Sequence, residues 1–228
     1  MITVTVSGTL IGYVRRLYDR ALEYLASGHG VRRGINGYTD SALPAYIITV
    51  AAVEAFLNEA FLSDWPRLIF KESSLWSVPK RSLDKMELGL KLVLIPQLLF
   101  TKSFSRDSQP YQDFDLLIKI RNDFVHYKMK GKSPKYLQAL DDRGISLVSP
   151  TKNSEADYAW PHKVSSSEGI RWAHNTACSV VQELVSFIPL QEAESGTIAL
   201  ASNFSYIPDS YAKDWLIKRG IDPESSNS

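Results

Sequence analysis

The stretch FDLLIKIRNDFVHYK, residues 114–128, divides into two faces on a helical wheel drawn at about 100° per residue. The polar arc of the wheel includes Asn122 and His126. The apolar arc is broad and is made by Phe114, Leu116, Leu117, Ile118, Ile120, Phe124, Val125 and Tyr127. This pattern predicts an amphipathic helix whose apolar face packs against other helices.

Four further segments carry helical patterns, and together they decide the fold class: 9–27, 41–63, 82–100 and 165–188. The 41–63 segment is apolar almost all round, so we expect the most buried helix there. Pro96 is expected to break or kink the 82–100 helix. Because strand signals are few and short, the sequence predicts an all-α fold, most simply an antiparallel bundle of four to five helices.

The ends of the chain are expected to lie outside the main helical body. We expect an N-terminal extension over 1–8, a helical domain over 9–190 and a C-terminal extension over 191–228. Within these, the alternation in ITVTV predicts a short strand, and a short helix is expected to stop at Gly220. Short irregular or β extensions are therefore expected at the termini and near 144–160.

Composition is that of an ordinary globular protein, with 228 residues, a charged fraction of 22% and a net charge of +1. No global field points to nucleic acid or membrane, although a locally basic cleft stays compatible with these numbers. The only cysteine is Cys178, which excludes an intrachain disulfide and a multi-cysteine zinc site. The first residues lack the pattern of a signal peptide, and the apolar run 42–57 is interrupted by Glu54. We expect a cytoplasmic protein.

Arg121 falls inside the apolar arc of the 114–128 wheel, where a guanidinium needs a partner because it cannot lose its proton. Glu54 and Asn58 are four residues apart, and so share one face of the apolar 41–63 helix. We expect Glu54, with Asn58, to face Arg121. Two interpretations stay open: an ion pair that only organises the core, or a functional arginine supported by these residues.

Other chemistry-bearing residues fit structural roles better. His29 lies in a glycine-containing segment that follows a helix and lacks the Gly-Lys-Ser/Thr ending of a phosphate loop. His162 follows a proline in a loop, and His174 lies on a helix where packing or solvation is expected. Cys178 is expected to be a core thiol.

The residues Arg121-Asn122-Asp123-Phe124-Val125-His126 have the form Arg-x-x-x-x-His with a polar residue after the arginine. This form resembles the signature of HEPN domains, an all-α family described as nucleotide-binding in higher eukaryotes and prokaryotes. Upstream, VEAFLNEAF resembles the glutamate-and-asparagine helix of that family, and SLDKMELGL resembles its lysine-containing third element. The likeness covers about residues 9–188.

The resemblance implies a helical bundle that usually forms a homodimer, with the Arg/His segments of two chains meeting at one cleft. Many members are metal-independent endoribonucleases, often toxins or antiviral defence effectors, and others are non-catalytic interaction or nucleotide-binding modules. The resemblance therefore implies RNA or a nucleotide, a second copy and, for a toxin, an antitoxin as partners, with no membrane, no cofactor and no metal. In the non-catalytic alternative, Arg121 and Glu54 form a structural ion pair.

The residue types fit RNA cleavage. Histidine exchanges a proton near neutral pH, so His126 is the expected general acid/base. Arg121 is the expected phosphate clamp, and Asn122 supports the other two. However, five residues turn a helix by about 500°, which leaves Arg121 and His126 about 140° apart. A long arginine stem, a helix that loosens near His126, or a second chain would each bring the two groups together.

Overall fold

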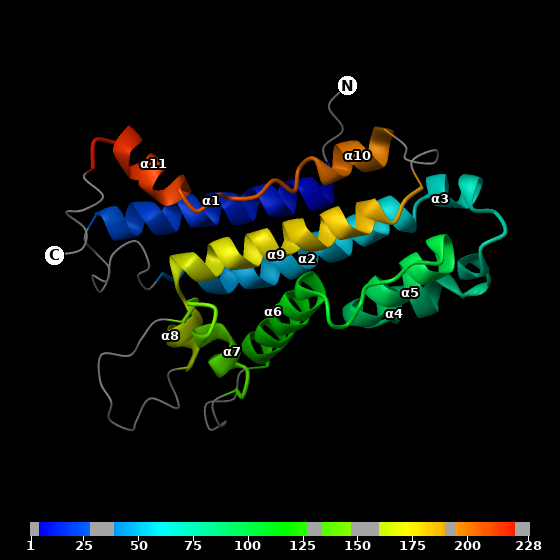
Figure 1. Ribbon diagram of the computed structural model, residues 1–228, viewed down its shortest axis with the longest axis horizontal. Coiled ribbons are helices and arrows are strands. Elements are labelled where there is room, and N and C mark those ends of the chain that lie inside the picture. Colours follow the sequence, from blue (N-terminus) through cyan, green and yellow to red (C-terminus); the bar gives the residue numbers. More distant parts are fainter. Residues whose placement is uncertain (1–4, 28–38, 127–133, 147–159, 190–194, 222–228) are drawn as a thin grey trace. The chain divides into compact units, whose positions relative to one another are not determined.

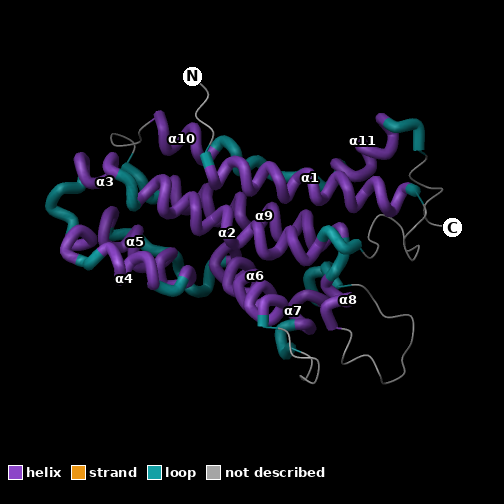
Figure 2. Tube along the Cα trace, turned by 180° about the vertical axis from the view of Figure 1, so that it is seen from behind, coloured by secondary structure: helices purple, strands orange, loops and turns teal. Residues whose placement is uncertain are grey.

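The computed structural model describes residues 5–27, 39–126, 134–146, 160–189 and 195–221. Within these ranges, all regular secondary structure is helical and there is no strand (Figures 1 and 2). The prediction of an all-α protein is therefore confirmed for the part of the chain that is described.

Four of the five predicted long helices are present with small changes at their ends. They are α1 (Val6–Ala26), α2 (Ala42–Phe61), α6 (Gln109–Val125) and α9 (Ser167–Ser186). Helix α6 begins five residues before the predicted 114–128 segment, and Pro110 stands in its first turn, where a missing N–H costs nothing. At the other end of the chain, α11 (Tyr211–Lys218) is followed by Gly220 at φ 69°, as predicted.

The fifth predicted helix, 82–100, is divided into two helices, and the division lies at Met86 and Glu87 and not at Pro96. It is replaced by α4 (Lys80–Lys85) and α5 (Leu88–Phe100), separated by Met86 and Glu87 with extended backbone at ψ 138°. Pro96 lies inside α5 and does not end it. Because Pro96 is itself buried, the surrounding packing holds the helix despite the missing hydrogen bond.

The predicted strand at 2–6 is also wrong where it can be compared, because Val6 is the first residue of α1. Residues 1–4 and the stretch 147–159, which covers most of the extension expected near 144–160, lie outside the described residues. The remaining elements are short: α3 (Asp64–Ile69), η1 (Ser74–Ser77), α7 (Leu137–Asp141), α8 (Trp160–Val164) and α10 (Ser195–Ala201).

The chain forms two compact units, each assembled from three segments. Unit one consists of Met1–Gly12, Thr49–Ile118 and Thr176–Ser205, and unit two consists of Tyr13–Ile48, Lys119–Asn175 and Tyr206–Ser228. Helices α1, α2, α6 and α9 therefore contribute residues to both units. The domain boundaries expected after residues 8 and 190 stay predictions.

Unit one has an aromatic core in which phenylalanine rings meet edge to face. Phe56 lies 5.5 Å from Phe204 and 6.0 Å from Phe61, and Phe61 lies 5.7 Å from Phe100, measured between ring centroids. The N-terminus of α1 is held by Glu59, whose carboxylate accepts hydrogen bonds from the backbone N–H of Val6 at 2.8 Å and of Ser7 at 3.3 Å. A carboxylate at this position satisfies helix N–H groups and opposes the helix dipole.

Unit two contains a series of aromatic contacts that surrounds Tyr46. Its ring stacks on Phe124 of α6 with the centroids 5.9 Å apart, and it meets Trp172 of α9 edge-on at 6.5 Å. Phe124 in turn lies 5.0 Å from Trp160, which meets the edge of Tyr136 at 6.4 Å. This series, Trp172–Tyr46–Phe124–Trp160–Tyr136, packs the C-terminal part of α6 into unit two.

The apolar character of α2 agrees with its burial. By length and composition alone, Ala42–Ile69 is apolar enough to cross a membrane, a test that core helices pass as well. Tyr46, Val53 and Phe56 are all completely buried inside the protein, as in a core helix.

Gly169 allows α9 to approach the Tyr46 hydroxyl, which is buried and donates a hydrogen bond to the carbonyl of Val164 at 2.6 Å. A Cβ at residue 169 would overlap Tyr46 Oη and crowd the Val164 carbonyl. We therefore expect Gly169→Ala to lower the free energy of unfolding by about 1–3 kcal/mol.

Tyr46→Phe removes the atom that the new methyl group would meet, so the double variant should be more stable than the sum of the two single changes predicts. Urea unfolding of wild type, both single variants and the double variant measures this coupling. Additive free energies would contradict the proposed clash.

Candidate functional site

Arg121, Asn122 and His126 lie at the C-terminal end of α6, in unit two. The side chains of Asn122 and His126 are exposed to solvent, and Arg121 is partly buried. The polar face expected for Asn122 and His126 is thus present, and so is the inward position expected for Arg121.

The helical backbone continues as far as His126, although α6 itself ends at Val125. The N–H of His126 donates to the carbonyl of Asn122 at 2.9 Å, which is the i to i−4 bond of an α-helix. A loosening of the helix before His126 is therefore not the way in which Arg121 and His126 approach each other. A long arginine stem and a second chain stay as the two open explanations.

Arg121 retains unused hydrogen-bonding capacity. Its Nε is buried and has no hydrogen-bond partner within the described part of the chain. A buried N–H without an acceptor is costly, and guanidinium groups are suited to bind phosphate and carboxylate oxygens. Arg121 is therefore a donor held in place on α6 without an acceptor from the described residues.

Glu54 has a different partner from the one that the sequence predicted. Its Oε1 lies 3.0 Å from Nζ of Lys91, within unit one, and Arg121 belongs to unit two. Lys91 is 1% exposed, whereas 40% of the Glu54 side chain remains open to solvent. Asn58, expected to assist Glu54, is exposed. The expected Glu54–Arg121 pair is thus corrected to Glu54–Lys91.

The burial of Lys91 has a signal in the sequence. It is the only charged residue in LGLKLVLIPQLLF, the apolar sequence of α5. A lone lysine in such a helix needs an anion for the same reason that Arg121 does. Arg121 and Lys91 were thus both possible partners of Glu54, and helical periodicity does not show which of them lies next to it.

Asp123 of α6 also has a partner that the sequence analysis missed. The hydroxyl of Tyr136 donates to Oδ2 of Asp123 at 2.8 Å. Burial, followed by this hydrogen bond and the charge of Asp123, raises the pKa of Tyr136 well above its usual value. Tyr136 therefore stays protonated and acts as a donor at neutral pH. No local sequence pattern signals this contact.

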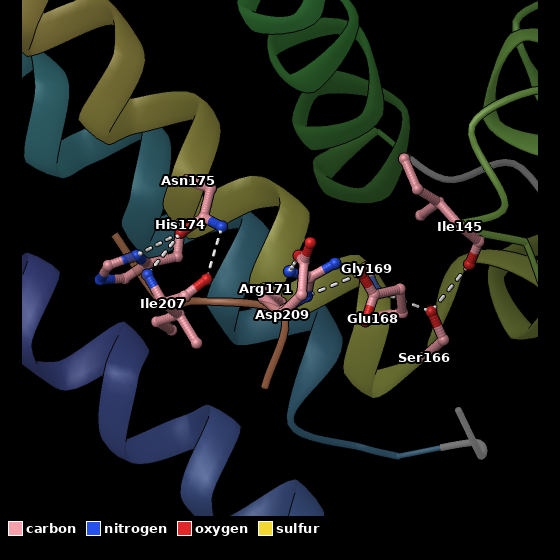
Figure 3. Close-up of polar contacts among 9 residues, drawn as sticks. All are labelled: Ile145, Ser166, Glu168, Gly169, Arg171, His174, Asn175, Ile207 and Asp209. Carbon is pink, nitrogen blue, oxygen red and sulfur yellow. Dashed lines mark hydrogen bonds and ion pairs between the residues drawn. The ribbon is translucent and has the colours of Figure 1, made fainter. Parts of the chain in front are cut away.

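A second polar cluster in unit two fastens the segment before α11 to α9 (Figure 3). Arg171 forms ion pairs with Glu168 and Asp209, and Asn175 is paired with the backbone of Ile207. The Asn175 amide donates to the Ile207 carbonyl at 2.9 Å and accepts from the Ile207 N–H at 2.8 Å. Because its groups satisfy one another, this cluster has the character of a structural clamp.

His174 lies beside this clamp and is 2% exposed, in agreement with the packing role that was expected. Burial is the main cause that lowers the pKa of His174 to about 4, and the charge of Arg15 lowers it further. The hydrogen bond with Asn175 acts in the opposite direction. At neutral pH the imidazole is uncharged, so His174 is a core residue.

The other candidate groups do not coincide with the Arg121–His126 segment. A hollow of about 400 Å³ in unit two is lined by Arg20, Glu23, Tyr24, Ser27, Thr39, Asp40 and Ser41. Among the described residues, no group of three or more His, Cys, Asp or Glu side chains is arranged to hold a metal ion. Cys178 is buried, as expected for a core thiol.

No protein-family model, curated protein sequence or solved structure matches the chain.

Glu54→Gln should lower the free energy of unfolding by about 1–3 kcal/mol, because it leaves the Lys91 ammonium buried without an anion. Adding Lys91→Met should recover most of this loss, since the charge itself is removed. Chemical denaturation of the three variants measures both effects.

The matched control is Glu23→Gln, which removes an exposed carboxylate 3.4 Å from Arg219. It should change stability by less than about 0.5 kcal/mol. A loss in Glu54→Gln as small as in this control would show that Lys91 does not need its partner.

The stability of the protein should also depend on His174 at mildly acidic pH. Because the folded state lowers the pKa of His174 to about 4, from an ordinary value of 6.5, the unfolded chain binds this proton more readily. Stability should therefore fall as the pH drops from 6.5 toward 4, with a total effect of about 3 kcal/mol.

Replacement by an uncharged residue, His174→Gln, should remove this part of the pH dependence. The measurement is urea unfolding of both proteins at several pH values between 7 and 4. The control is His162→Gln, which replaces an exposed histidine. Parallel curves for wild type and His174→Gln would contradict the assignment.

Proposed function

We propose that the chain is a HEPN-like, metal-independent endoribonuclease that cleaves RNA by attack of a ribose 2′-hydroxyl on the neighbouring phosphate. The observation that carries the proposal is the end of α6, where an exposed His126 follows an Arg121 with a buried, unpartnered Nε. The resemblance of this segment to the Arg-x-x-x-x-His signature supplies the class of reaction.

In the proposed reaction, the imidazole of His126 accepts the proton of the 2′-hydroxyl. The 2′-oxygen then forms a bond to phosphorus, and the bond from phosphorus to the 5′-oxygen breaks after that oxygen has gained a proton from an acid. The products are a 2′,3′-cyclic phosphate and a free 5′-hydroxyl. Arg121 stabilises the negative charge that grows on the phosphate oxygens. Asn122 is exposed one helical turn before His126 and supports the phosphate or the imidazole.

A homodimer is part of this proposal. Arg121 and His126 leave α6 about 140° apart, and the helical hydrogen bond to His126 keeps this separation. A second copy would supply the missing group from its own α6, including the acid that protonates the leaving oxygen. The resemblance further suggests a cytoplasmic toxin or antiviral defence effector, whose activity an antitoxin partner would restrain.

The test is the incubation of purified protein with labelled RNA in EDTA, followed by analysis of the product ends. Wild type should produce 2′,3′-cyclic phosphates, and RNA with 2′-deoxyribose at the cleaved positions should remain intact. His126→Ala and Arg121→Ala should each lower the rate at least about 100-fold, the scale of a lost acid/base group or charge stabiliser.

Matched controls are His162→Ala and Arg106→Ala, which remove an exposed histidine and an exposed arginine from other parts of the chain. Both should cleave like wild type. If wild type leaves RNA intact, or if His126→Ala and Arg121→Ala cleave normally, the ribonuclease proposal is wrong. The alternative would then be a non-catalytic helical module that binds a partner or a nucleotide.

A further inference from the structure

Tyr136 is held against the end of α6 by two direct contacts in unit two. Its hydroxyl donates to Asp123 at 2.8 Å, and its ring meets the edge of Trp160 with the centroids 6.4 Å apart. Trp160 lies in turn 5.0 Å from Phe124, the residue that follows Asp123. Tyr136 therefore holds one carboxylate oxygen of Asp123 in a defined place.

Asp123 stands one helical turn before His126. Side chains three residues apart on a helix are neighbours, with about 5–6 Å between their Cβ atoms. The backbone hydrogen bond from His126 to Asn122 keeps this spacing to the end of the helix. Tyr136 takes Oδ2 of Asp123, and Oδ1 accepts no hydrogen bond within the described residues. Asp123 is thus a partly buried carboxylate that shares the helix surface with the exposed His126 by sequence spacing, and no hydrogen bond or ion pair joins the two side chains in the described part of the chain.

Among the described residues, the other charged and titratable groups near Asp123 come from few elements. On α6, Lys119 lies one turn earlier and Arg121 two residues earlier, and both are cations. From the segment before α7, the neighbour is Tyr136, whose own titration is influenced by Tyr46 of α2. Because burial and the hydrogen bond keep Tyr136 protonated, its hydroxyl stays a donor to Asp123 at neutral pH.

We propose that Asp123, held by Tyr136, is a positioning residue that orients the imidazole of His126 and stabilises it after it has taken a proton. A carboxylate beside a histidine fixes the ring and favours its protonated form, which is the form that general-base catalysis produces. Tyr136 acts through Asp123 and has no contact with the reacting atoms. This role rests on the proposed ribonuclease function, but the pairing of Asp123 with His126 can be tested without it.

The first experiment is an NMR titration of the imidazole signals in the full-length protein. The sequence has 4 histidines, and the His126→Gln spectrum identifies the signal that belongs to His126. Asp123→Asn should lower the midpoint of this titration by about half a pH unit, as expected for the loss of one partly screened charge at this separation. Asp123→Glu, which keeps the charge, should restore most of the difference.

The chain contains a matched control for this change. Asp19 accepts a hydrogen bond from the hydroxyl of Tyr211 at 2.9 Å, in the same unit, and the residue three positions later is Leu22. Asp19→Asn therefore removes an equivalent tyrosine-bound carboxylate that has no histidine one turn later. It should leave the His126 midpoint unchanged. An Asp123→Asn midpoint equal to that of wild type, or equal to that of Asp19→Asn, would overturn the pairing.

The second experiment measures RNA cleavage as a function of pH. In Asp123→Asn, the acidic limb of the kcat/KM profile should move to lower pH together with the NMR midpoint, and kcat should fall about tenfold. Tyr136→Phe should lower kcat by a smaller factor in wild type and have no further effect in Asp123→Asn, because Tyr136 acts through Asp123. Equal effects of Tyr136→Phe in the two backgrounds would show a separate, structural role and overturn this part of the proposal.

The two experiments separate the possible failures. If wild type does not cleave RNA, the proposed function is wrong, and the NMR titration still decides whether Asp123 is paired with His126. If RNA is cleaved and the His126 midpoint does not respond to Asp123→Asn, the function stands and the positioning role is wrong. Thermal melting of each variant shows whether it is folded, and Asp123→Glu replaces Asp123→Asn in the kinetic comparison if the asparagine variant unfolds.

Discussion

The packing of the buried Tyr46 side chain is the contact on which the candidate site depends. Its ring stacks on Phe124, and its buried hydroxyl lies next to Gly169 of α9 and donates to the carbonyl of Val164 at the end of α8. A buried hydroxyl without an acceptor would be costly, so this hydrogen bond fixes the ring on which α6 rests. The presentation of His126 to solvent on the opposite face of α6 follows from this arrangement.

Buried charge is the second constraint, and the protein meets it in two different ways. Lys91 is enclosed and has Glu54 as its partner, an arrangement that is fully explained by stability. Arg121 is less enclosed, and its Nε has no acceptor within the described residues. Lys91 has an anionic partner, so Glu54 has a structural role. The Nε of Arg121 has no acceptor among the described residues, so Arg121 is the better candidate for binding a ligand.

The proposed chemistry needs groups from more than one place. His126 supplies an imidazole that is exposed to solvent, and Arg121 supplies an Nε–H that has no acceptor within the described residues. Tyr136 adds a fixed hydrogen bond to the neighbouring Asp123. In the proposed function, these side chains bind a phosphate group at the end of the helix. Arg121 and His126 point in directions about 140° apart, which is why the proposal includes a second copy of the chain.

The all-α class and most of the long helices could be predicted from the sequence, because helical periodicity and capping signals are local properties. The faces of α6 were predicted only in part, since Val125 of the apolar arc is 55% exposed. The sequence by itself also determined that Arg121 and Glu54 would each need an oppositely charged partner or a hydrogen-bond partner. Only the tertiary structure decided that Glu54 meets Lys91, that Asp123 meets Tyr136 and that Pro96 stays inside α5. These choices join residues that are far apart in the chain or depend on the packing around them. The need for a partner is a property of one residue, whereas the identity of the partner is a property of the packing.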